Sequence, residues 1–126
     1  KTEEINYYKK TGIYPPMHCV AIRREVYEQN RWIAQSLYKA FLAAKEYSTI
    51  AYMFDGHLRY ALPFLHAAVE EHHQIFGDED PWNYGVEENR HTLETLVSYS
   101  HEQGLIPRAY DLSELFAEET WATSRN

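Results

Sequence analysis

The chain has few of the features that mark several common classes of protein. Its 126 residues include one cysteine, Cys19, so no internal disulfide can form. No apolar run approaches the ~20 residues that a membrane-spanning helix needs. Basic residues are in the minority, 12 Lys and Arg against 19 Asp and Glu, and no basic stripe offsets the net charge of -7. The sequence therefore predicts neither a disulfide scaffold, nor a membrane protein, nor a partner of nucleic acid.

The chain also lacks internal repeats, low-complexity stretches and any motif that requires a metal or a nucleotide, so we expect no cofactor. Aromatic residues, by contrast, are abundant: eleven Tyr, five Phe and three Trp make up 15% of the chain. Side chains of this kind serve a core, an interface or a pocket for a flat ligand. Length and composition are those of one globular domain.

The stretch from Met17 to Ile22 predicts a β-strand. It is short and nearly all apolar, it contains the β-branched Val20, and Pro15-Pro16 precede it. A near-continuous apolar run is typical of a strand buried on both faces of a sheet. We find no second strand in the sequence, although the backbone groups of a strand must pair.

Two explanations follow for this unpaired strand. The chain is a piece of a larger protein, or the strand pairs with the same strand of another copy. We expect exposed strand edges to associate, and the sequence then predicts a homodimer with residues 14–24 at the interface.

The rest of the chain predicts helices. Gly12, Gly77 and Gly104 stand as stop signals, and Asn30 as the N-cap of the longest helix. The apolar stripe predicted to face inward on that helix comprises Ile33, Leu37, Ala40, Phe41 and Ala44. The predicted helices span about 1–10, 24–28, 31–53, 63–76, 86–103 and 111–116. The predicted class is mainly α with one isolated β-strand.

Four stretches carry a resemblance to a known family. They are IYPPMHCVAIRREVYEQNRWIAQSLYKAFLAAK, ALPFLHAAVEE, DPWNYGVEENRHTLETLVSYSHEQGL and DLSELFAEET, and PWNYG…NRHTLETL…YSHEQGL is the most specific part. Together they cover roughly residues 12 to 119 and resemble the C-terminal part of 4,5-dihydroxyphthalate decarboxylases. That family is similar to the solute-binding proteins of ABC transporters.

The resemblance implies a two-lobed α/β fold of the periplasmic-binding-protein type (type II), with the ligand in a cleft between the lobes. Residues 1–126 would form a single C-terminal fragment, a crossing strand plus closing helices, without the N-terminal lobe. The chain begins at Lys1 without an initiator Met, as a fragment does.

The implied function is decarboxylation of a dihydroxylated aromatic dicarboxylate such as 4,5-dihydroxyphthalate, with the fragment itself inactive. We expect a small aromatic acid as substrate and a cytoplasmic location. The alternatives are a solute-binding protein without chemistry, periplasmic if the parent carries a leader, or a helical self-associating module.

Five residues are candidates for the site. His18, at the entrance to the predicted strand, is the candidate catalytic acid, or alternatively a core histidine bonded to a backbone carbonyl. Arg90 is the candidate anchor for a substrate carboxylate, or a solvated arginine. Tyr14, Trp82 and Tyr84 are candidate substrate-binding aromatics, and the two loop aromatics could equally fill an interface. We expect Trp82 to be substantially buried.

One further cluster resembles a metal site by its spacing. His66, Glu70 and His73 lie at i, i+4 and i+7. They fall on the polar side of their predicted helix and lack a fourth ligand, so we interpret them as a solvated face and predict no metal.

Overall fold

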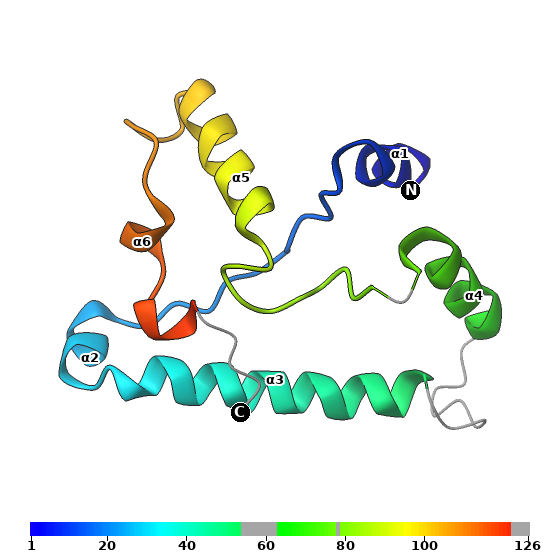
Figure 1. The fold of residues 1–126 in the computed structure, drawn as a ribbon, viewed down its shortest axis with the longest axis horizontal. Coiled ribbons are helices and arrows are strands. Elements are labelled where there is room, and N and C mark those ends of the chain that lie inside the picture. Colours follow the sequence, from blue (N-terminus) through cyan, green and yellow to red (C-terminus); the bar gives the residue numbers. More distant parts are fainter. Residues whose placement is uncertain (54–62, 78, 122–126) are drawn as a thin grey trace. The chain divides into compact units, whose positions relative to one another are not determined.

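The computed structural model describes residues 1–53, 63–77 and 79–121. Within these ranges the regular structure is helical and contains no strand (Figure 1). The elements are α1 (Thr2–Thr11), α2 (Arg24–Gln29), α3 (Trp32–Met53), α4 (Leu65–Phe76), α5 (Arg90–Glu102), α6 (Leu112–Leu115) and the 3₁₀-helix η1 (Glu118–Thr120). The mainly helical class is confirmed, and the predicted helices form close to their expected bounds.

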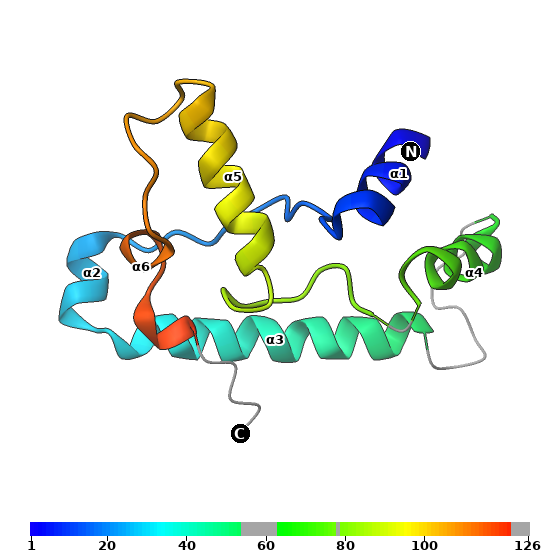
Figure 2. The ribbon, with the colours of Figure 1, turned by 45° about the horizontal axis from the view of Figure 1, so that its top comes forward.

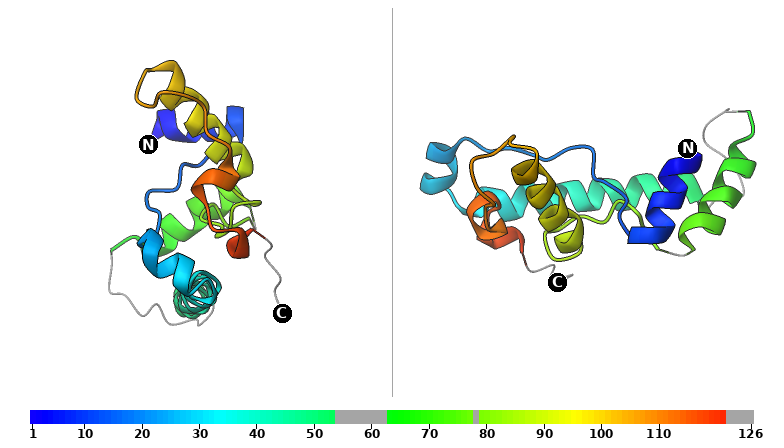
Figure 3. Two further views of the ribbon diagram at one scale, coloured as in Figure 1. Left: turned by 90° about the vertical axis from the view of Figure 1, so that its left-hand side faces the viewer. Right: turned by 90° about the horizontal axis from the view of Figure 1, so that it is seen from above.

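The ends of the first helices show how local sequence sets these bounds. Helix α1 ends where Gly12 adopts φ 71°, and its N–H donates to the carbonyl of Tyr8 at 2.7 Å. Asn30 was predicted to cap α3, but its side chain does not do so. Its Nδ2 instead donates to the carbonyl of Val26 at 3.4 Å, and its own carbonyl accepts from Ile33 N at 3.0 Å. Helix α3 is straight and is seen almost end-on in the left view of Figure 3.

Residues 12–23 join α1 to α2 without regular secondary structure, which corrects the strand predicted over Met17–Ile22. They run as an open stretch between the two helices (Figure 2). The described part of the chain supplies no second strand, and no hydrogen bond joins the backbone of residues 17–22 to it. A β-forming sequence becomes a strand only where a sheet edge is available to pair with it.

The chain divides into two compact units, Lys1–Ser36 with Trp82–Asn126, and Leu37–Pro81. The first unit holds a cluster of buried apolar side chains, Val86, Leu93 and Leu112, against which Val97, Phe116 and Trp121 pack. Side chains of its helices also meet. Tyr27 of α2 donates a hydrogen bond to Glu119 of η1 at 2.6 Å, and interaction with Tyr7 of α1 raises the pKa of Tyr99 of α5.

The second unit contains most of α3 together with α4. Leu65 opens α4 and is buried, whereas the preceding Phe64 is 86% exposed and has φ 63°. Lys45 of α3 forms an ion pair with Asp80 of the same unit.

Few apolar side chains are buried in the described part of the chain: Ile13, Ala34, Leu65, Val86, Leu93 and Leu112. Of the stripe predicted to face inward on α3, Leu37 and Phe41 are exposed, and so is Leu96 on α5. A chain of this length ordinarily buries most of its apolar residues. These helices therefore present apolar surface that the described residues do not cover. None of the described helices is long and apolar enough to span a bilayer.

Candidate functional site

The side-chain amide of Asn89 bonds to the backbone of the loop before α5. Asn89 Nδ2 donates to the carbonyl of Asn83 at 2.7 Å and to that of Gly85 at 2.9 Å. Gly85 has φ 115°, a backbone conformation that residues with a β-carbon rarely adopt. The loop that carries Trp82 and Tyr84 is thereby held to the N-terminus of α5. Sequence reasoning missed this role of Asn89, since nothing in the spacing distinguishes it from an ordinary helix cap.

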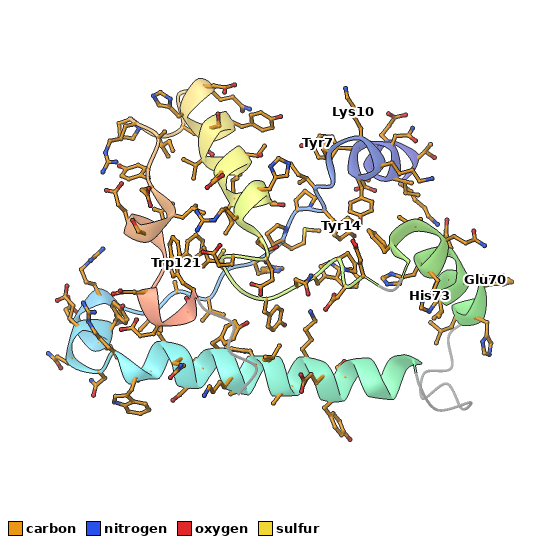
Figure 4. All side chains as sticks on the ribbon, viewed as in Figure 1. Tyr7, Lys10, Tyr14, Glu70, His73 and Trp121 are labelled. Atoms are coloured by element: carbon orange, nitrogen blue, oxygen red, sulfur yellow. The ribbon has the colours of Figure 1, made fainter. Side chains whose placement is uncertain are left out.

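The structure brings two of the five predicted site residues together. The rings of Tyr14 and Trp82 meet edge to face, with centroids 5.7 Å apart and planes at 71°. They come from the 12–23 connection and from the loop before α5, and Tyr14 is labelled in Figure 4. This geometry is the one that aromatic quadrupoles favour.

Both loop aromatics keep a large accessible surface. Trp82 is 50% exposed and Tyr84 40% exposed, so the predicted burial of Trp82 is wrong.

Arg90 is held by two carboxylates of its own helix end. Its Nε and Nη2 donate to the two oxygens of Glu87 at 3.1 and 2.6 Å, and its Nη1 donates to Glu94 at 3.2 Å. The pair with Glu87 raises the pKa of Arg90, and hydrogen bonding from Arg90 lowers the pKa of the Glu87 carboxyl. A substrate carboxylate would have to displace Glu87 before it could bind the guanidinium bidentately.

The partners of Arg90 could have been predicted from the sequence. Glu87 and Glu94 lie three residues before it and four after it, the spacing of side chains that meet on a helix surface. Its guanidinium also lies over the ring of Trp121, 5.2 Å from the centroid, at the end of the described chain (Figure 4). That contact joins segments far apart in the sequence, and no local pattern predicts it.

His18 lies on the irregular connection and is exposed. It has no hydrogen bond or ion pair within the part of the chain that the structure describes, so the bonded core histidine considered from the sequence is not found. Its role as an acid stays a prediction. In the described ranges, no hydrogen bond, ion pair or ring contact joins it to Tyr84 or Arg90.

The cluster on α4 is exposed at His66, Glu70 and His73. His73 Nδ1 lies 3.2 Å from the carbonyl of Gly77, at the end of its own helix, and Figure 4 labels it with Glu70. Within the described residues, no three Cys, His, Asp or Glu side chains gather closely enough to hold a metal ion. The solvated face expected from the sequence accounts for these residues.

A second polar network was missed altogether. Glu119 accepts the hydroxyl of Tyr27 and lies 3.7 Å from Arg31, whose guanidinium is 5.5 Å from the centroid of the Tyr27 ring. The hydrogen bond raises the pKa of Tyr27 and lowers that of Glu119. Tyr27 and Glu119 are 92 residues apart, so no sequence motif could have indicated the pair.

Comparison with known proteins gives one informative similarity. No family model matches the chain. The chain is 28% identical over 110 residues, 87% of its length, to a 4,5-dihydroxyphthalate decarboxylase of Comamonas testosteroni. It spans 33% of the length of that relative. The chain is thus distantly similar to about a third of a decarboxylase.

Proposed function

We propose that this chain is the C-terminal part of a longer decarboxylase that acts on a dihydroxylated aromatic dicarboxylate such as 4,5-dihydroxyphthalate. The similarity to a decarboxylase of that name over 87% of the chain is the observation that carries the proposal. The sparse core of the described residues and their exposed apolar side chains support a chain completed by further protein. A cytoplasmic site of action is part of the proposal, and a secretory leader upstream would place the protein in the periplasm instead.

The reaction asks little of the protein in covalent chemistry. The bond between the ring carbon and the carboxylate carbon breaks, CO₂ leaves, the electron pair stays on the ring, and a proton takes the vacated position. A positioned acid supplies that proton, and His18 is the candidate because imidazole exchanges protons near neutral pH. The remainder of the protein would have to cover His18, since catalysis of this kind benefits from exclusion of water.

The other candidates would bind the substrate. Tyr14 and Trp82, whose rings meet edge to face, would contact the aromatic ring of the substrate, and Trp82 is 50% exposed. Tyr84, on the same fixed loop, would line the approach. Arg90 would hold the carboxylate that is not lost, after exchanging Glu87 for the substrate.

The test uses the longer protein that contains this sequence. With 4,5-dihydroxyphthalate we expect CO₂ and 3,4-dihydroxybenzoate in equal amounts, whereas the 126-residue chain alone gives neither. His18→Gln should lower kcat/KM by about 10²–10⁴-fold. His101→Gln changes an exposed histidine of α5 and serves as the matched control, with activity within about threefold of the parent.

Each part of the proposal can fail separately. If the longer protein forms no product, the decarboxylase function is wrong. If it binds the aromatic acid tightly without product, it is a solute-binding protein. If His18→Gln and His101→Gln behave alike while the parent is active, another group delivers the proton.

A further inference from the structure

Arg90 is held by contacts of two different kinds. Its hydrogen bonds to Glu87 and Glu94 lie at the edges of the guanidinium group, because the N–H groups of arginine point outward in the plane of the group. Trp121 contacts the same group from its face, with the guanidinium carbon 5.2 Å from the ring centroid. An exchange of partners at an edge can therefore take place while the contact at the face remains.

The indole of Trp121 is fixed by the protein without help from Arg90. Its ring packs on the buried apolar cluster of the first unit, and Figure 4 labels the residue. Its backbone N–H donates to the carbonyl of Glu118 at 3.2 Å, at the end of η1. The arginine, by contrast, has a long side chain that is 41% exposed. The packed ring can therefore orient the flexible guanidinium group, rather than the reverse.

The indole nitrogen shows why the face of this ring matters. Nε1 of Trp121 is buried, and no acceptor for its N–H is found in the described residues. An unpaired buried donor is destabilising, and a phenyl ring at this position would avoid that loss. A hydrogen bond within the described residues therefore does not account for an indole here. What the indole offers is the aromatic face that attracts a cation most strongly.

We propose that Trp121 is the positioning residue of Arg90: its indole fixes the plane of the guanidinium group, so that a substrate carboxylate replaces Glu87 at an edge that is already oriented. This inference rests on the proposed function, in which Arg90 holds the carboxylate that is not lost. Glu94 does not supply the orientation by itself, because one hydrogen bond at 3.2 Å leaves the group free to turn about it. An anchor oriented in advance loses less side-chain freedom when the substrate binds.

Nuclear magnetic resonance of the 126-residue chain tests the contact itself. In the unsubstituted chain we expect nuclear Overhauser effects between the side-chain protons of Arg90 and the ring protons of Trp121. Their absence would overturn the proposal without any substitution. In Trp121→Leu the Nε–H proton of Arg90 should move downfield, because a proton over an aromatic face is shielded and the leucine removes that face. A resonance that stays in place would likewise overturn the proposal.

Phe116→Leu is the matched control for these spectra. Phe116 packs on the same apolar cluster as Trp121, and no cation–π contact between its ring and Arg90 is found in the described residues. This variant should therefore leave the Nε–H resonance of Arg90 at its position in the parent chain. Equal movement in Trp121→Leu and Phe116→Leu would assign the effect to lost packing and contradict the proposal.

Steady-state kinetics of the longer protein with 4,5-dihydroxyphthalate test the effect on the anchor. Trp121→Leu should raise KM about three- to thirtyfold and leave kcat within about twofold, since an anchor that holds substrate and transition state alike affects KM alone. In an Arg90→Gln background the same substitution should change KM by less than about twofold, because Trp121 acts through Arg90. Equal effects in the two backgrounds would mean that the indole acts on packing and not on the anchor.

Trp121→Phe is a milder change that keeps an aromatic face and removes the unpaired N–H. This variant should keep KM within about threefold of the parent. It should also leave the Arg90 Nε–H resonance upfield of its position in Trp121→Leu. A phenylalanine variant whose KM rises as far as that of the leucine variant would show that the aromatic face has no role.

Failure of the inference and failure of the proposed function give different results. If the longer protein forms no product while Trp121→Leu still moves the Arg90 resonance, Trp121 orients Arg90 and the decarboxylase function is wrong. If the protein is active and Arg90→Gln leaves KM unchanged, Arg90 is not the anchor and the inference fails with it. If Arg90→Gln raises KM and Trp121→Leu does not, the anchor is retained and the positioning role of Trp121 is wrong.

Discussion

Two parts of the first unit place their apolar side chains differently. Residues 86–121 fold on themselves: Leu112 of α6 packs on Val86 and Leu93, and the helix begins with a complete capping box. Residues 12–23 bury Ile13 and leave Met17 and Val20 open. A helix satisfies its backbone within its own segment, whereas a strand depends on a partner elsewhere. Apolar side chains of residues 86–121 are therefore covered by neighbouring helices, whereas Met17 and Val20 are not covered by the described residues.

The largest effect on stability that we predict is for a substitution in the core of residues 86–121. Leu112 is 3% exposed, so Leu112→Ala should lower the free energy of unfolding by about 2–3 kcal/mol, through lost burial and a residual cavity. Leu115→Ala, on the same short helix but 50% exposed, is the control and should cost less than about 1 kcal/mol. Urea unfolding followed by circular dichroism measures both. Equal losses would mean that residues 86–121 have no specific core.

A smaller effect is expected from the polar link between α2 and η1. Tyr27→Phe removes the 2.6 Å hydrogen bond to Glu119 and should cost about 1 kcal/mol in the same unfolding assay. The hydrogen bond raises the pKa of Tyr27 above 10.0, so its contribution should be complete below pH 10 and be lost as the pH rises through the folded value.

The control for this link is Tyr110→Phe. The Tyr110 ring lies under Arg108, 4.1 Å from the guanidinium carbon, and no hydrogen bond to its hydroxyl is found in the described residues. Loss of the hydroxyl should leave stability within about 0.5 kcal/mol of the parent. If Tyr27→Phe is equally silent, Glu119 does not hold η1 to α2.

The exposed ion pair of Arg108 and Glu114 should be detected mainly as a change in the pKa of Glu114. Arg108 donates to both oxygens of Glu114 at 2.9 and 2.6 Å, and Asp111 N donates to Glu114 at 3.0 Å, which together lower the Glu114 pKa to about 2. A depressed pKa stabilises the fold above the ordinary value of 4.5, and this contribution should fade as the pH falls from 4.5 to about 2.

Carbon-detected NMR of the Glu114 carboxyl measures that pKa directly. Arg108→Gln should move it back toward 4.5, since the hydrogen bond from Arg108 is the largest cause of the shift. The part that remains below 4.5 reports the capping bond from Asp111. An unchanged pKa in this variant would show that the two side chains do not pair in solution.

The sequence predicted those features that depend on neighbours along the chain. Helix bounds followed from Gly12 and Gly77 and from apolar spacing, and even the Glu87–Arg90–Glu94 bonds follow from helical intervals. The sequence did not predict contacts between segments that are far apart along the chain. Nothing local indicated that Glu119 would meet Tyr27.

The same distinction explains the errors in the fold and at the candidate site. The stripe through Leu37 and Phe41 was assigned to a core because helical periodicity identifies an apolar face but not what covers it. Trp82 was expected to be buried because its neighbours Pro81 and Gly85 would let the loop fold back on the helices. Its contact with Tyr14 depends on the path of residues 12–23 and could not be read from spacing.

The smallest effect on stability that we predict is for a substitution in the exposed part of residues 12–23. In the 126-residue chain Val20 is 65% exposed and touches no core, so Val20→Asp should change the free energy of unfolding by less than about 0.5 kcal/mol. Ile13→Asp is the matched control, because Ile13 lies in the same connection but is 5% exposed, and a charge there should destabilise strongly. Urea unfolding of the two variants side by side gives the contrast. A large loss at Val20 in the isolated chain would mean that residues 17–22 are already packed there. If Val20→Asp leaves the free energy of unfolding unchanged while Ile13→Asp lowers it, the packed part of this connection ends between Ile13 and Val20.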